Sequence, residues 1–227
     1  MNNKKLWGGR FKKPLDPIAI ELSYSLESDK KLLFYDLAVN QVHLAGLYQA
    51  NIVTKQEFDT LNNCLDQLRD DFKSNPDPLY GDDEDIHSCI ERLVTERCGD
   101  LGKKLHTGKS RNDQVITDTR LYTKDRLANI ISQLQQLIDE LVQQADTYRD
   151  LIFPGFTHFQ PAQPVLFAHH LCAYCEQFFR DLKRFQYAYQ ESDYCALGSG
   201  ALAGNNYNLD REFMAKQLGF AHVTTNS

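Results

Sequence analysis

The chain lacks the features that mark membrane, secreted and nucleic-acid-binding proteins. No apolar run approaches the roughly 20 residues that a membrane-spanning helix needs. The start, MNNKKLWGGRF, has two lysines. In a secretory signal an apolar segment would follow them, and here none does. No block of lysine or arginine stands out, and the net charge is −6 with a pI near 5.6. We therefore expect a cytoplasmic protein with no membrane or nucleic-acid partner.

Cysteine is present, but not in a pattern that indicates a disulfide framework. The chain has 6 cysteines scattered through helical patterns, and without a secretory signal we expect reduced thiols. Cys172 and Cys175 form a C-x-x-C with His169 just upstream, which would also suit a redox or metal site. Because this spacing lies inside a helical pattern and no second pair complements it, packing cysteines are the favoured interpretation. We expect no metal and no cofactor.

Glycine and proline are absent from two long stretches, 109–153 and 165–197. Such stretches exceed the usual length of a globular helix and are typical of a helical bundle. The first carries an apolar stripe at helical spacing, made of Ile116, Leu127, Ile130, Leu134, Leu137, Leu141 and Ala145. Strand signals are weak throughout. The sequence predicts an all-α fold, with an N-terminal helical domain over 1–108 and an incomplete central long-helix bundle over 109–227.

Shorter helices are predicted in the N-terminal part and near the end. We expect an irregular segment up to about residue 28, and then a helix from Asp29 to near Asn51. Thr54 and Glu57 form a capping-box pattern in front of an apolar face of Phe58, Leu61, Leu65, Leu68 and Phe72. The acidic segment DDEDIH opens a further helix with Gly99 as its end, and LDREFMAKQLGF reads as a short amphipathic helix.

The segment GFTHFQPAQP, 155–164, separates the two long stretches. Its glycine and prolines exclude the interior of a helix or of a central strand. A loop stiffened by prolines and aromatic residues is suited to holding Thr157 and His158 in one geometry, as a binding or catalytic site requires. The alternative, equally compatible with the local sequence, is a helix connection whose histidine caps a neighbouring element.

The segment HTGKSRNDQ, 106–114, stands where the first long helix begins. Ser110, Asn112 and Asp113 are all good caps, so a well-capped helix is one interpretation. The other is an anion site, because Lys109 and Arg111 add positive charge where the helix dipole already favours a carboxylate or phosphate.

Two further segments have weaker local signals. His87 follows Glu84 and Asp85, and a carboxylate neighbour would favour a charged histidine that contacts substrate. Taken locally, an exposed acidic first turn is the preferred interpretation. The segment LGSGALAG lacks the phosphate-loop pattern and follows no predicted strand, so it indicates a turn or a close helix crossing.

Taken together, the motifs resemble those of argininosuccinate lyases, which belong to the superfamily of fumarase, aspartase and adenylosuccinate lyase. The resemblance rests on six segments in matching order: KLWGGRF, GDDEDIHS, HTGKSRNDQ, PGFTHFQPAQP, GSGALAGN and LDRE. It covers essentially the whole chain and corresponds to the N-terminal portion of these longer enzymes. It implies cleavage of argininosuccinate to arginine and fumarate, in a cytoplasmic homotetramer whose sites are shared between subunits.

The resemblance also implies roles for particular residues. Ser110, Arg111 and Asn112 would hold substrate carboxylates. Thr157 would hydrogen-bond the substrate, and His158 would act as an acid–base group. Ser25, in the pattern S-L-x-x-D, would be a substrate contact, and His87 would lie near the site. No metal or cofactor is implied.

Members of this family continue with a mobile loop that ends in M-P-Q-K-K-N-P and carries the proton-abstracting serine. The sequence does not contain that motif, so the resemblance implies that these 227 residues alone are inactive. Two alternatives stay open. One is a related fumarate-releasing lyase, such as one acting on adenylosuccinate, and the other is a crystallin-like structural protein on the same scaffold.

Overall fold

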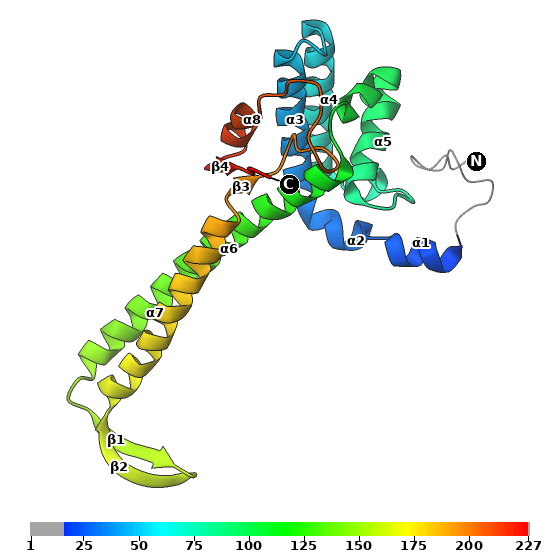
Figure 1. Ribbon diagram of the computed structural model, residues 1–227. Coiled ribbons are helices and arrows are strands. Elements are labelled where there is room, and N and C mark those ends of the chain that lie inside the picture. The colour runs from blue at the N-terminus through cyan, green and yellow to red at the C-terminus, as the bar shows by residue number, and fades with distance from the viewer. Residues whose placement is uncertain (1–15, 227) are drawn as a thin grey trace. The chain divides into compact units, whose positions relative to one another are not determined.

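The computed structural model describes residues 16–226, and the chain divides into two compact units, Met1–Thr107 and Gly108–Ser227. Within the described ranges, none of the helices is long and apolar enough to cross a membrane. Helices dominate both units, as Figure 1 shows, and the strands of residues 16–226 form two two-stranded sheets. The predicted all-α class is confirmed.

The first unit is built from helices and short 3-10 turns: α1 (Pro17–Ser23), α2 (Leu26–Asp29), η1 (Lys30–Leu32), α3 (Leu33–Gln49), α4 (Lys55–Ser74), η2 (Asp77–Leu79), α5 (Ile86–Cys98) and η3 (Gly99–His106). Helices α3, α4 and α5 pack on one another. Leu37, Leu44, Leu61, Leu65 and Ile90 in their shared core are completely buried. Burial of leucine and isoleucine at this density supplies the main stabilisation of such a unit.

Helix α4 forms as the sequence predicts. The Thr54 hydroxyl accepts from the Glu57 amide at 3.3 Å, and the Glu57 carboxylate accepts from the Thr54 amide at 2.9 Å. This reciprocal cap satisfies donors that the first turn would otherwise leave open. Its apolar face is buried at Leu61, Leu65, Leu68 and Phe72.

Two predictions for the N-terminal part need correction. The segment before residue 28 is helical at Pro17–Ser23 and again from Leu26. The first of these helices begins there because Asp16 accepts from the Ile18 amide at 2.9 Å and Pro17 occupies the first helical position. The predicted helix from Asp29 begins later, since a 3-10 turn precedes α3. The KLWGGRF motif lies outside the described residues.

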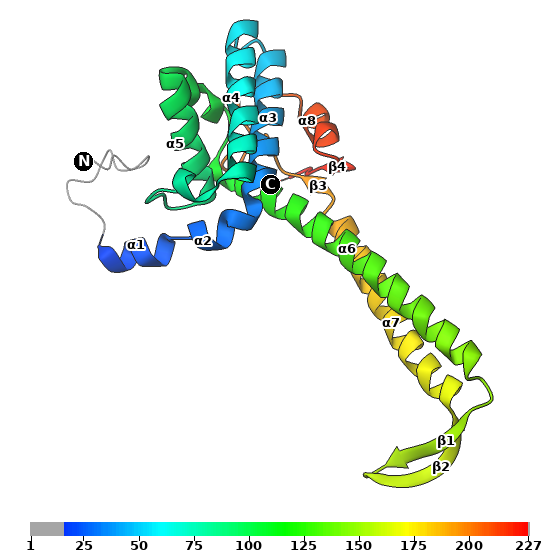
Figure 2. The ribbon, with the colours of Figure 1, turned by 180° about the vertical axis from the view of Figure 1, so that it is seen from behind.

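The second unit contains α6 (Arg111–Thr147), β1 (Ile152–Thr157), β2 (Gln160–Leu166), α7 (Phe167–Glu191), β3 (Tyr194–Cys195), α8 (Arg211–Gln217) and β4 (His222–Val223). Helices α6 and α7 pack side by side, and the β1–β2 hairpin joins them at one end, as both views show (Figures 1 and 2). At 1.5 Å per residue, α6 is about 55 Å long. Its length separates two predicted site segments, 106–114 at its start and 155–164 beyond its end.

The proline-rich segment between the long helices is a β-hairpin, which the sequence did not predict. β1 and β2 pair antiparallel, with Thr157 opposite Gln160 and a register shift between Pro154 and Phe156. In a two-stranded sheet both strands are edges, so proline is tolerated there. The exclusion of a central strand therefore holds, while the expectation of a loop without strands was wrong.

Beyond α7, the chain folds back on α6 through a buried lysine. Lys124 of α6 forms an ion pair with Asp193 and donates to the Gly219 carbonyl at 2.7 Å. Its ammonium also lies 4.7 Å from the ring centroid of Phe220. A buried ammonium is tolerated only with such partners, so these contacts fix the segment after α7 against α6.

Candidate active site

The N-terminus of α6 is capped by its own side chains. The Ser110 hydroxyl accepts from the Asn112 amide at 3.3 Å, and the Asp113 carboxylate accepts from the Ser110 amide at 2.9 Å. Arg111 is partly exposed and donates to the Gln114 side chain at 3.0 Å, while Asn112 is exposed. The capped-helix interpretation therefore describes the geometry, and the anion-site interpretation depends on Arg111, Asn112 and the helix dipole.

The buried carboxylate of Asp113 connects this helix start to the glycine-rich segment 197–206. Its second oxygen accepts from the Gly198 amide at 3.1 Å and from the Gly200 amide at 2.8 Å. Burial raises the pKa of the Asp113 carboxyl, and the amides of Gly200, Ser110 and Gly198 act in the opposite direction. One side chain thus holds two of the motifs that the sequence singles out.

Glycine is required in this segment by the backbone conformation. Gly198 and Gly200 have φ values of +90° and +67°, which side chains on L residues rarely adopt. A Cβ on Gly200 would also meet the Gly204 carbonyl oxygen at 2.9 Å. The segment is a tight turn, as the sequence indicates, and it brings backbone amides toward the start of α6.

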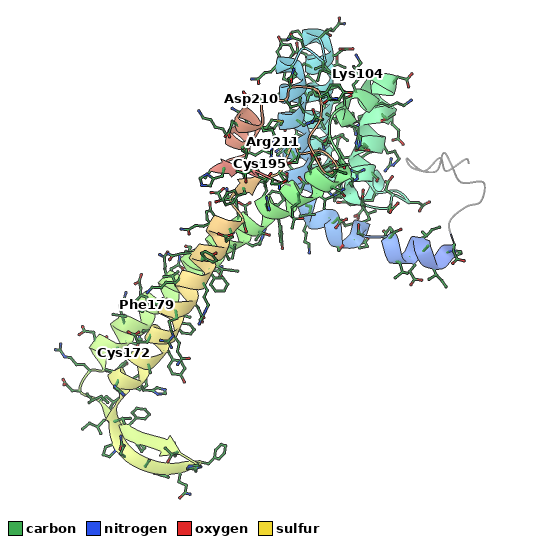
Figure 3. The ribbon with its side chains drawn as sticks, in the orientation of Figure 1. Lys104, Cys172, Phe179, Cys195, Asp210 and Arg211 are labelled. Carbon is green, nitrogen blue, oxygen red and sulfur yellow. The ribbon has the colours of Figure 1, made fainter. Side chains whose placement is uncertain are left out.

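A second anchor of the glycine-rich segment comes from α8. Arg211 donates to the Ser199 hydroxyl at 3.0 Å and to the Thr224 hydroxyl at 2.7 Å. Arg211, which Figure 3 labels, also donates to the Leu197 carbonyl at 3.5 Å. A cavity of about 440 Å³ lies against this segment and includes Asn205 and Arg211 in its lining.

We expect Asp113→Ala to destabilise the second unit by about 3 kcal/mol. The change removes a helix cap and leaves buried amides of the glycine-rich segment without their acceptor. Urea unfolding followed by far-ultraviolet circular dichroism measures the effect. Asp139→Ala, the same change at an exposed position of α6, is the control. A loss no larger than in the control would show that Asp113 does not anchor the segment.

Thr157 and His158 lie at the tip of the β1–β2 hairpin. His158 and Phe159 form its two-residue turn, with φ values of 50° and 58°. A turn of this kind suits Asn-Gly, so histidine and phenylalanine there carry backbone strain of about 1 kcal/mol or more each. Thr157, His158 and Phe159 are exposed, and the ring of Phe159 is completely so. The tip is both strained and exposed. We therefore expect Thr157 and His158 to contact a substrate or another subunit and not the rest of the hairpin.

Within one copy of the second unit, the two predicted clusters do not meet. Ser110, Arg111 and Asn112 stand at the start of α6, whereas Thr157 and His158 lie beyond its other end (Figure 1). The length of α6, about 55 Å, lies between them. A small substrate held by Arg111 therefore cannot touch His158 of the same chain.

In the first unit, Ser25 lies next to the acidic segment that precedes His87. The Ser25 amide donates to the Glu84 carbonyl at 2.9 Å, and its hydroxyl donates to Asp29. Ser25 is partly exposed. Ser25 thus stands directly before α2, and its bond to Glu84 places it close to the start of α5.

His87 is buried, unlike the exposed acidic turn that the local sequence favours. Its Nδ1 lies 2.8 Å from the Asp36 carboxylate, and Asn40 donates to the same carboxylate at 2.8 Å. A carboxylate on α3 thus faces His87, whereas the sequence pointed to the neighbouring Glu84 and Asp85. Sequence reasoning missed Asp36, and the available signal was a pair of polar residues four apart on an otherwise apolar helix face.

The C-x-x-C motif lies on α7 near its hairpin end, and Figure 3 labels Cys172 there. Cys172 is exposed whereas Cys175 is buried, so the two thiols have different surroundings. This difference supports the packing interpretation for Cys175.

Comparison with known proteins gives consistent matches over nearly the whole chain. Residues 9–227 match the profile of a family described as lyase. The chain is 47% identical over 223 residues to an argininosuccinate lyase from Thermoanaerobacter sp. (strain X514), an alignment that covers 98% of this chain and 50% of that protein. The chain spans about half the length of the curated relatives it matches.

Solved structures share the fold at low sequence identity. An EDDS lyase variant with bound fumarate has a TM-score of 0.78 at 24% identity, covering 95% of this chain and 43% of that one. A fumarate lyase:delta crystallin from Brucella melitensis has a TM-score of 0.71 at 14% identity, covering 96% and 51%. These similarities place the helical architecture among known lyase folds.

Proposed function

Because this chain belongs to the lyase family, whose profile it matches over residues 9–227, we propose that it forms part of an enzyme that cleaves argininosuccinate to arginine and fumarate. The observation that carries the proposal is the start of α6, where Arg111 and Asn112 accompany a helix N-terminus. The identity to argininosuccinate lyases, 47% in one relative, favours this substrate over adenylosuccinate.

The reaction is an elimination. A proton next to a carboxylate is removed, the C–N bond breaks, and negative charge develops on the carboxylate as it becomes an aci-carboxylate. A site for this step needs fixed donors around the carboxylate and an acid–base pair across the bond. Arg111 suits a carboxylate because its planar guanidinium can donate to both oxygens, and Ser110 and Asn112 add neutral donors.

In this proposal, Thr157 hydrogen-bonds the substrate and His158 moves a proton. Ser25 contacts the substrate and His87 lies near it. The serine that abstracts the proton belongs to the family's M-P-Q-K-K-N-P loop, whose motif these 227 residues do not include. No residue proposed here needs a metal or a cofactor.

The separation of the two clusters implies a site shared between copies of the chain. Arg111 and His158 stand at opposite ends of α6 and α7, so only different copies can bring them to one substrate. An antiparallel arrangement of long helices from neighbouring subunits places opposite ends together.

The α6–α7 pair also has an apolar surface suited to such an assembly. On the predicted stripe of α6, Leu127 and Ala145 are buried, but Ile130 and Leu137 are 38% and 43% exposed. On α7, Phe179 and Tyr187 are 45% and 64% exposed. Large apolar side chains repeated along a helix pair indicate an interface. We propose a homotetramer, as in the family that the motifs resemble.

Fumarate release tests the proposed substrate. The chain is assayed with argininosuccinate and separately with adenylosuccinate, both alone and as a completed enzyme, meaning this chain joined to the part of the Thermoanaerobacter relative that it does not cover. We expect release from argininosuccinate by the completed enzyme, and none from the chain alone. Release from adenylosuccinate only would overturn the substrate, and a stable completed tetramer without either activity would favour the crystallin-like alternative.

A further inference from the structure

A carboxylate and an imidazole are buried against each other in the first unit. Asp36 of α3 and His87 of α5 are 0% and 1% exposed, and Asp36 Oδ1 lies 2.8 Å from His87 Nδ1. The Asn40 side chain donates to the other Asp36 oxygen at 2.8 Å. A buried pair of this kind is often no more stable than well-packed apolar residues, so stability alone does not account for its presence.

The burial of His87 limits what this residue can do for a substrate. A side chain that is 1% exposed offers almost no surface to a bound molecule. Its imidazole instead faces the Asp36 carboxylate of α3 on the Nδ1 side. His87 therefore contributes to the site by holding its own segment of the chain in place, and Asp36 is the group that holds His87.

The segment that contains His87 is anchored on both sides. On one side, Asp83 accepts from Arg92 Nε at 3.0 Å and from Arg92 Nη2 at 2.8 Å. Two parallel bonds of this kind fix the orientation of the carboxylate as well as its distance. On the other side, His87 meets Asp36 of α3. The main chain between the two anchors consequently has little freedom to move.

Glu84 lies between the two anchors, and its carbonyl holds Ser25. The Ser25 amide donates to this carbonyl at 2.9 Å, directly before α2 begins. Ser25 is partly exposed, so unlike His87 it can meet a substrate. A shift of the Glu84 carbonyl would move Ser25 with it. Displacing a substrate-positioning group by about 1 Å can lower a rate about 100-fold.

We propose that Asp36 is a positioning residue of the enzyme, and that it fixes Ser25 through His87 and the Glu84 carbonyl. The inference deepens the proposed function, on which it rests, because Ser25 is a substrate contact in that proposal. Asp36 acts through His87 and not by contact with the substrate. The same arrangement gives His87 a role that its burial permits.

Amide hydrogen exchange, followed by NMR spectroscopy, tests the positioning in the 227-residue chain without any substrate. In Asp36→Ala, His87 loses its carboxylate, so the Ser25 amide should exchange about tenfold faster or more than in the unchanged chain. The Thr224 amide, which donates to the Cys195 carbonyl at 2.9 Å in the second unit, is the internal reference and should keep its rate. An unchanged Ser25 rate would overturn the proposal.

Two further variants separate positioning from a general loss of stability. Asp36→Asn should restore most of the protection, because the new amide can turn its oxygen toward Asn40 and its nitrogen toward His87. The Asn40 nitrogen stays in place, since it also donates to the Asp36 main-chain carbonyl at 2.9 Å. Leu44→Ala, at another completely buried position of α3, is the matched control and should accelerate Ser25 exchange much less. Equal acceleration in Asp36→Ala and Leu44→Ala, or none of the protection restored by Asp36→Asn, would contradict the proposal.

A double-mutant cycle in the completed enzyme tests the connection to the substrate. Asp36→Ala should lower kcat/KM about 10- to 100-fold. Because it acts through Ser25, the double variant with Ser25→Ala should be no worse than Ser25→Ala alone, whereas Leu44→Ala and Ser25→Ala should add. Additive losses for Asp36 and Ser25 would overturn the proposed route. If the unchanged completed enzyme does not cleave argininosuccinate, the proposed function fails, and the exchange rates still decide whether Asp36 positions Ser25.

Discussion

Replacing His158 with alanine lowers the turnover of argininosuccinate by the completed enzyme about 10²- to 10⁴-fold, without unfolding the protein. This is the usual loss when a positioned acid–base group is removed. His158 is exposed at the hairpin tip and contributes nothing to a core, so the fold should tolerate the change. Steady-state fumarate release measures turnover, and circular dichroism checks the fold.

The strained turn requires a second variant. His158 has a φ of 50°, and asparagine tolerates this conformation better than most residues. His158→Asn should therefore keep the hairpin while removing proton transfer, and should lose as much turnover as the alanine variant. His169→Ala, at an exposed position of α7, is the matched control and should retain full activity. Normal turnover in either His158 variant would remove this residue from the site.

Replacing Arg111 with alanine lowers kcat/KM about 10²- to 10³-fold in the same assay. This is the loss expected when a bidentate, charge-assisted hydrogen bond to a substrate carboxylate is removed from a desolvated site. Its guanidinium contacts Gln114 one turn along α6, so the helix itself should remain intact. Calorimetric titration with fumarate gives a second readout, in which binding weakens together with kcat/KM.

The variant Arg111→Lys distinguishes the contribution of the positive charge from that of the two parallel hydrogen bonds. Lysine keeps the positive charge but cannot donate along two parallel bonds, so we expect an intermediate loss of about tenfold or more. Arg126→Ala, an exposed arginine farther along α6, is the control. If Arg111→Ala binds fumarate as tightly as the control does, the start of α6 is not the carboxylate site.

The sequence predicts the elements whose signals are local. The capping box of α4 and its buried stripe follow directly from the positions of Thr54, Glu57, Leu61 and Leu65. The two long helices follow from stretches without glycine or proline. Signals of this kind depend on neighbours three or four residues away, which a sequence displays.

The features that were missed depend on longer-range or unusual backbone geometry. The hairpin is hidden because His158 and Phe159 occupy a turn that Asn-Gly would normally mark. The carboxylate beside His87 is Asp36, which lies on another helix. The hydrogen bonds from the Gly198 and Gly200 amides to Asp113 join residues that are 85 and 87 positions apart in the sequence. None of these pairings has a local pattern.

Mixing the two inactive variants tests the central claim, that Arg111 and His158 serve one site from different copies of the chain. Completed Arg111→Ala and His158→Ala enzymes are dissociated together, reassembled and assayed for fumarate release. Random assortment gives about a quarter of the sites both unchanged residues, so the mixture should regain about a quarter of full activity. His158→Ala mixed with His158→Asn should regain none. A mixture of the first pair no more active than its separate components would contradict a shared site.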